Sequence, residues 1–246
     1  MFSNHFMNNF SSYPILDSVL AARGACFRVV PHKVSVSDLY RLDRKFTKNE
    51  FLTTLSSMQN GKSPGIDGLP CEFYKVIMWN ILGDDFNALS HEIFSTGSFS
   101  KSLSQCIIKL IRKNVARDSI GGCCPITLLS VSYKIMAKAL TLRVQEVVAR
   151  KIVHREHTSF MRGRCILDIF FSAWEAMEWA REFRQQALFL KIDFEKTCDC
   201  IDWSVIISML ACLSFGPRCV SMISTLFSST SSFVSVNNFV SLYPSS

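Results

Sequence analysis

The sequence predicts an α+β fold that is rich in helices and contains a small mixed or antiparallel sheet. Residues 70–96, 131–152 and 166–184 have the spacing of apolar side chains that is typical of amphipathic helices. Shorter apolar runs at 106–111 and 187–192 have the length and composition of strands. With 246 residues and 48% hydrophobic content, the chain can bury a core as one large domain or two small ones.

The N-terminal part divides into a leader and a first helix. Residues 1–41 show no clear hydrophobic period, and we expect them to form a poorly ordered or non-homologous leader. Thr47 and Glu50 have the spacing of a capping box, in which each side chain satisfies an unpaired backbone donor of the first turn. A helix is therefore predicted from here to about Met58, where the Gly-rich turn 60–68 ends it.

The helical region 70–96 is expected to be two helices that are broken near Gly83, with Gly97 as the closing residue. In the later helix 131–152, Lys134, Lys138 and Arg143 are predicted to project outward from the face that is opposite to the apolar stripe.

Asp193 directly follows the apolar run 187–192, which we interpret as a largely buried strand. The carboxyl end of a strand is where ligands and metals are commonly held in mixed sheets. The alternative is that Asp193 only caps the following turn. Beyond it, Asp202 has the position of a helix N-cap, Gly216 and Pro217 separate two helices, and 232–242 is strand-like.

The net charge of +7 is unevenly distributed. Residues 101–164 contain thirteen Lys or Arg and three acidic residues, an excess of ten positive charges. A basic segment of this kind is typical of proteins that bind a phosphate backbone. It is also compatible with a solvated helix face that keeps the protein soluble, and the charge pattern alone leaves both readings open.

Ten cysteines occur without Cys-x-x-Cys spacing, and no Cys/His cluster has the spacing of zinc ligands. No secretory leader is visible at the start of the chain, so we expect reduced thiols and an intracellular protein, cytoplasmic or nuclear. The longest apolar stretch near the end, 203–215, is too short to span a bilayer, and no membrane partner is expected. The oligomeric state stays open.

The segment around Asp193 reads Asp193-Phe194-Glu195-Lys196-Thr197-Cys198-Asp199-Cys200-Ile201-Asp202-Trp203. This run resembles the first catalytic motif of reverse transcriptases from non-LTR (LINE-type) retrotransposons. Further segments follow in the order in which that family has them: Asn60-Gly61-Lys62-Ser63-Pro64-Gly65-Ile66-Asp67-Gly68, Glu72-Phe73-Tyr74-Lys75, Leu110-Ile111-Arg112-Lys113, Pro125-Ile126-Thr127-Leu128-Leu129 and Phe160-Met161-Arg162-Gly163-Arg164. So many ordered matches, over roughly residues 42–243, are a specific signal.

The resemblance implies a partial right-hand polymerase, with the fingers and the start of the palm in residues 42–246. It implies RNA-directed DNA polymerisation with an RNA template, a DNA primer, deoxynucleotide substrates and two magnesium ions. In that chemistry Asp193 and the carbonyl of Phe194 would be metal ligands, and Asp193 would be catalytic. The other implied site residues are Lys113 and Cys198 for the nucleotide, and Lys62, Arg112, Arg162 and Arg164 for nucleic acid.

Several positions depart from the family pattern. Cys123-Cys124 stands where the family usually has Trp-Arg, so Lys113 lacks the arginine with which it would clamp a triphosphate. Cys198 replaces an aromatic residue that would exclude ribonucleotides. Phe160 is expected to anchor its loop in the core rather than to stack on bases.

The second Asp pair of the family is absent from the sequence, and one carboxylate cannot hold two magnesium ions. We therefore expect a reverse-transcriptase-like chain that is catalytically inactive by itself. The alternatives are a noncatalytic RNA-binding module and a translated remnant without function.

Overall fold

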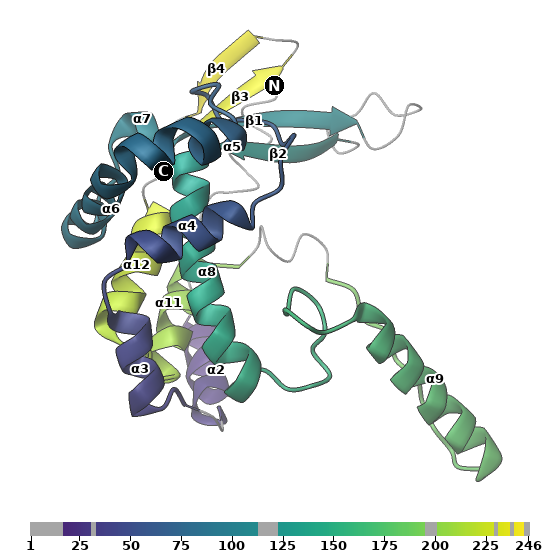
Figure 1. Cartoon of the computed structure of the whole chain (residues 1–246). Coiled ribbons are helices and arrows are strands. Elements are labelled where there is room, and N and C mark those ends of the chain that lie inside the picture. Colours follow the sequence, from purple (N-terminus) through teal and green to yellow (C-terminus); the bar gives the residue numbers. More distant parts are fainter. Residues whose placement is uncertain are drawn as a thin grey trace.

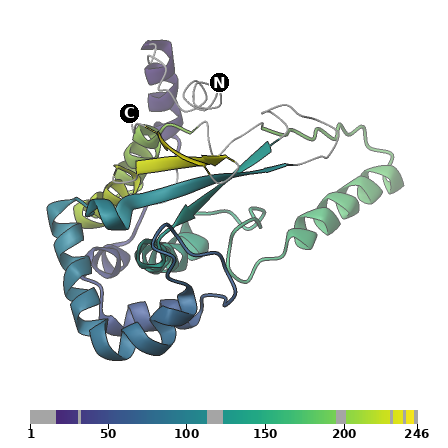
Figure 2. The same cartoon turned by 90° about the horizontal axis from the view of Figure 1, so that it is seen from above.

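The computed structural model describes residues 17–30, 33–112, 123–194, 201–228, 231–236 and 239–243. A body of helices surrounds the long helix α8 (Val131–Lys151), and a small sheet lies at one end of this body (Figure 1). Helix α9 (Ile166–Glu182) projects away from the rest (Figures 1 and 2). The predicted α+β class with many helices and a small mixed sheet is confirmed, whereas a polymerase architecture stays a prediction.

The N-terminal segment contains more regular structure than its sequence indicated. Helix α2 (Asp17–Arg28) has no buried residue, but α3 (Val36–Asp43) packs against the body and buries Leu42 completely. The expected leader therefore includes α2 and most of α3. The amphipathic pattern of α3 extends over only two turns, which is too short to stand out in the sequence.

Helix α4 (Lys48–Ser56) begins where the capping box predicted. The Thr47 hydroxyl accepts a hydrogen bond from the Glu50 amide at 3.3 Å, and the Glu50 carboxylate accepts one from the Thr47 amide at 3.0 Å. Phe51 and Leu55 are buried, as the helical spacing requires.

The next helical region is continuous through Gly83, which corrects the predicted break. It consists of α5 (Cys71–Phe73), a π-helical turn (Tyr74–Met78) and α6 (Trp79–Thr96), and Gly97 closes it with φ of +71°. The irregular turn thus lies upstream of the expected position. Gly83 instead allows a close approach, since an added Cβ would lie 2.8 Å from the Lys48 side chain.

Four strands form the sheet, in the order β2-β1-β3-β4. The short helix α7 (Lys101–Ser104) leads into β1 (Gln105–Arg112), which pairs antiparallel with β2 (Cys123–Leu129) and parallel with β3 (Ser231–Val236). Strand β4 (Phe239–Tyr243) then pairs antiparallel with β3. The strand-like pattern at 106–111 is confirmed, and the described residues of 232–242 form strands as predicted. Strand β1 joins segments that are far apart in the chain.

The C-terminal helices α11 (Trp203–Cys212) and α12 (Pro217–Ser228) are separated at Gly216, as predicted. Asp202 caps α11 by accepting a hydrogen bond from the Ser204 amide at 2.8 Å. Asp43, at the end of α3, accepts one from the Cys219 amide at 2.8 Å and so holds the first turn of α12 against the N-terminal helices.

The predicted strand at 187–192 is not formed, which is the largest difference from the sequence analysis. Residues 185–194 have no regular secondary structure, and their apolar side chains are exposed, Leu188 to 91%. A strand needs a neighbour for its backbone groups. Among the described residues no segment pairs with this one, so its apolar composition alone does not produce a strand.

Candidate nucleic-acid interface

The Gly-rich turn 60–68 is held by charged side chains from elsewhere. The Glu72 carboxylate accepts a hydrogen bond from the Gly61 amide at 2.5 Å. The ammonium of Lys75 donates to the Met58 carbonyl at 2.6 Å and to the Asn60 side chain at 2.7 Å. Lys62 is exposed in this turn and has no partner among the described residues. Its role in nucleic-acid binding stays a prediction.

The basic side chains of α8 do not all project outward, which corrects the sequence analysis. Lys134 donates to the Ser63 carbonyl at 3.2 Å, and Lys138 donates to the Ser57 carbonyl at 3.1 Å. Burial lowers the pKa of Lys134. Part of the positive charge of the segment 101–164 is thus used to fix the turn region against α8.

Arg143 is buried, with 8% of the residue exposed, and it joins three elements. Its guanidinium donates to the Arg44 carbonyl at 2.6 Å and to the Glu50 carboxylate at 2.8 Å. It also lies 3.8 Å from the centre of the Phe46 ring, a cation–π contact. Sequence periodicity placed this residue at the surface because it could not reveal that carbonyl groups from the α3–α4 connection point at α8.

The loop 152–165 after α8 carries the two arginines of the predicted template contact. Arg164 is partly buried and donates to the carbonyls of Ala149, Val153, His154 and His157, at distances between 2.6 and 3.1 Å. It thereby satisfies carbonyl groups that the end of α8 leaves unpaired. Arg162 is exposed and has no partner among the described residues. Arg164 thus stabilises the loop against the end of α8, whereas Arg162 is available to bind an external anion.

A cleft of about 860 Å³ lies between α3, α4, α8 and this loop. Its charged lining is Arg41, Arg44, Arg143, Arg162, Arg164, Glu50 and Glu146. Five arginines and two glutamates give an excess of three positive charges. Arg41 pairs with Glu146 at 2.7 Å, and Arg44 and Arg143 share Glu50 at 2.9 and 2.8 Å. Among the described residues, Arg162 and Arg164 have no carboxylate partner, so the excess charge is largely theirs. A basic concave surface of this size is suited to phosphate groups.

The predicted catalytic segment lies apart from regular structure. Asp193 and Phe194 are exposed at the end of the segment 185–194. Arg112 ends β1 opposite Cys123, which fixes its backbone. Lys113 and Cys198 lie outside the described residues. Of these predicted site residues, the structure therefore places Asp193, Phe194 and the backbone of Arg112.

The described residues around Asp193 do not fit a pair of magnesium ions. Two such ions require carboxylates that converge from separate segments, and Asp193 with the Phe194 carbonyl supplies one carboxylate and one neutral oxygen. Among the described residues, no three His, Cys, Asp or Glu side chains lie close enough together to hold a metal ion.

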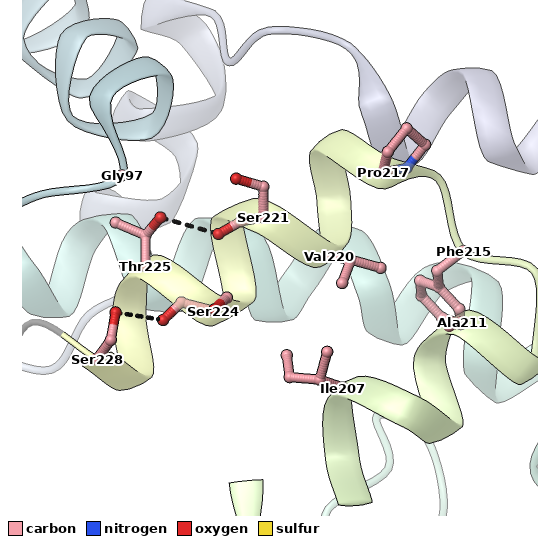
Figure 3. A pocket seen from close by; sticks show the side chains of 10 residues that line it. All are labelled: Gly97, Ile207, Ala211, Phe215, Pro217, Val220, Ser221, Ser224, Thr225 and Ser228. Carbon is pink, nitrogen blue, oxygen red and sulfur yellow. Dashed lines mark hydrogen bonds between the residues drawn. The ribbon is translucent and has the colours of Figure 1, made fainter. Parts of the chain in front are cut away.

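A second pocket, of about 630 Å³, lies between α11 and α12 near Gly97 (Figure 3). Its lining is apolar or hydroxylic, and none of the lining residues is charged. The hydroxyls of Thr225 and Ser228 donate to carbonyls one turn earlier in α12, at 2.8 and 2.9 Å. This pocket offers a phosphate no charged partner, and the Arg-lined cleft is the better candidate.

The chain is 34% identical over 197 residues to the Transposon TX1 uncharacterized 149 kDa protein of Xenopus laevis. The chain is related to a transposon protein. The similarity covers 80% of the chain and 15% of the relative. No protein-family model matches the chain. Within the described ranges, each helix is too short or too polar to cross a lipid bilayer.

Two carboxylates, Glu50 of α4 and Asp38 of α3, have lowered pKa values, so the stability of the fold depends on pH in the acidic range. Burial tends to raise the pKa of Glu50, but the hydrogen bond and charge of Arg143 and the Thr47 amide outweigh it, so this pKa lies below its ordinary 4.5. Hydrogen bonds from Lys151, at 2.5 Å, and from Ser35 hold the pKa of Asp38 below 3.8. Groups with a depressed folded pKa stabilise the fold above their unfolded pKa and lose this effect as the pH falls through the folded value.

We expect the free energy of unfolding in urea to be nearly constant from about pH 7 to pH 5 and to decrease below about pH 4.5. Glu50→Gln should flatten this decrease, whereas Asp85→Asn, at an exposed carboxyl of α6, should leave it unchanged. An equally steep acid loss in Glu50→Gln would contradict the assignment to Glu50.

Proposed function

We propose that the chain is a reverse-transcriptase-like part of a non-LTR retrotransposon protein, and that its described region binds nucleic acid without catalysing polymerisation by itself. The observation that carries this proposal is the ordered series of family-like motifs from the Gly-rich turn to Asp202-Trp203. The similarity to a transposon protein over 197 residues supports the retrotransposon origin.

The arrangement of cations favours a nucleic-acid partner over a purely solvating role. Lys134, Lys138 and Arg164 are used inside the fold, but Lys62 and Arg162 remain exposed on two loops that this scaffold supports. Loops that are held in place and carry free cations are suited to a phosphate backbone, since little order must be gained on binding.

Catalysis by the isolated chain is not expected because its described residues offer one carboxylate where two magnesium ions need several. Template-primed incorporation of deoxynucleotides by the purified chain is the direct test, with Asp193→Ala as the control. Incorporation above background that Asp193→Ala abolishes would overturn the catalytic half of the proposal.

Binding is tested separately, by titrating the chain into a labelled RNA at several salt concentrations. Affinity should fall as salt rises, with a logarithmic slope of about −0.7 for each neutralised phosphate of a single strand. Undetectable or salt-insensitive binding would refute the nucleic-acid role. If the purified chain also lacked a cooperative unfolding transition, a remnant without function would be the better description.

A further inference from the structure

Phe160 has an unusual environment for a large aromatic side chain. It is 92% exposed, which overturns the expectation that it anchors its loop in the core. Its backbone also has φ of +58°, a left-handed conformation that a bulky residue adopts at an energetic cost. An exposed ring on a strained backbone does not stabilise the core. Its position is better explained by contact with another molecule.

The backbone around Phe160 is held in place. The side-chain amide of Gln145, on α8, donates to the Phe160 carbonyl at 2.9 Å, and Thr158 is buried. Arg164 fixes the other end of the loop through its four carbonyl contacts. The exposed ring is therefore presented by a supported loop.

The same loop forms a wall of the Arg-lined cleft. Arg162, two residues after Phe160, lines the cleft and is exposed, and Gln145 lines it as well. The exposed ring of Phe160 is thus close in sequence to the guanidinium of Arg162, which is unpaired among the described residues, and to the basic surface of the cleft. Proteins that bind single-stranded nucleic acid combine these two features, because the aromatic ring stacks on a base while the cations contact the phosphates.

We propose that Phe160 and the Arg-lined cleft form a binding site for single-stranded nucleic acid, with a base stacked on the Phe160 ring and the neighbouring phosphates at Arg162 and in the cleft. The inference rests on the proposed nucleic-acid function and assigns it a place and a mode of recognition. A base that is paired in a duplex does not expose its face, so the site selects unpaired strands.

The exposed aromatic residues of α9 are poor candidates for this role. Helix α9 exposes Phe170, Phe171 and Trp174, but four acidic residues lie on the same helix, and Arg181 is its one basic residue. Its negative charge repels phosphate. This helix therefore provides a matched control for the removal of an exposed ring.

The test compares two labelled oligomers of equal charge by fluorescence anisotropy: single-stranded RNA of about 12 nucleotides, within the range of known site sizes, and an abasic phosphodiester of the same length. Phe160→Ala should weaken RNA binding at least about fivefold and leave the abasic oligomer unaffected. Phe160→Tyr should restore RNA binding. Arg162→Ala should weaken both oligomers and reduce the salt slope by about 0.7.

Two control variants separate these effects from general damage. Phe170→Ala removes an exposed ring of α9, and Lys101→Ala removes an exposed charge of α7, which does not line the cleft; neither should change RNA affinity by more than about twofold. Thermal unfolding should show that Phe160→Ala folds at least as stably as the parent, because Phe160 is not in the core.

The outcomes distinguish the inference from the function on which it rests. If the parent chain binds RNA and Phe160→Ala binds it equally well, the stacking site is refuted and the nucleic-acid function stands. If Phe160→Ala weakens RNA and the abasic oligomer to the same extent, the ring does not act through bases and the inference also fails. If the parent chain binds neither oligomer, both proposals fall.

Discussion

Replacing Arg143 by Met is expected to lower the free energy of unfolding by about 3–5 kcal/mol, the usual range when one partner of a buried ion pair is removed. The substitution keeps much of the aliphatic volume but removes every donor. It leaves the carbonyls of Leu42 and Arg44 without their guanidinium donor, and it leaves Arg44 as the remaining guanidinium at the Glu50 carboxylate. The effect should be large because Arg143 joins α8 to the connection between α3 and α4.

Urea unfolding at neutral pH, followed by far-UV circular dichroism, measures this loss. Arg41→Met is the matched control, because Arg41 pairs with Glu146 at 2.7 Å on the surface and an exposed pair contributes at most about 1 kcal/mol. Similar losses in the two variants would show that burial of Arg143 is not the cause.

Gly65→Ala is expected to destabilise the protein by about 1–3 kcal/mol through overpacking, with about 1 kcal/mol more if the cap of α8 is displaced. A Cβ atom at this position would lie 2.6 Å from the backbone nitrogen and Cα of Ser130. Ser130 cannot easily yield, since it is fully buried, caps α8 by accepting from the Tyr133 amide, and donates to the Leu103 carbonyl at 3.0 Å.

The thermal midpoint of Gly65→Ala should therefore decrease markedly. Gly24→Ala should instead leave it unchanged or raise it, because Gly24 lies in α2 with no atom within 4 Å of an added Cβ, and alanine favours a helix by up to about 1 kcal/mol. An unperturbed midpoint in Gly65→Ala would mean that the turn 60–68 does not pack against the start of α8 in solution.

Local signals predicted the elements whose formation depends on neighbouring residues. The Thr47–Glu50 box predicted the start of α4 because both partners lie within one turn. The Asp202 cap and the separation of α11 from α12 at Gly216 followed from equally short-range rules. The motif series around Asp193 predicted a relationship to retrotransposons, and the similarity to a transposon protein agrees with it.

Features that depend on distant partners were not predictable in this way. The run 187–192 has the composition of a strand, but no described segment pairs with it. Gly83 was interpreted as a break, yet it lies within α6 beside Lys48. Phe160 was expected in the core because most aromatic side chains are buried, and its exposure became visible only once the surrounding loop had a position.

The sequence by itself determined the helices α4, α8, α9, α11 and α12, the caps at Thr47 and Asp202, the excess of basic residues between 101 and 164, and the order of the motifs that resemble those of retrotransposon proteins. Only the tertiary structure decided how the basic residues are used. Lys134, Lys138, Arg143 and Arg164 bind backbone carbonyls of the protein itself, while Arg162 remains free at the cleft. The physical reason is that a cation's partner depends on which acceptors the fold brings within hydrogen-bonding distance, and these acceptors come from residues that are distant in the chain.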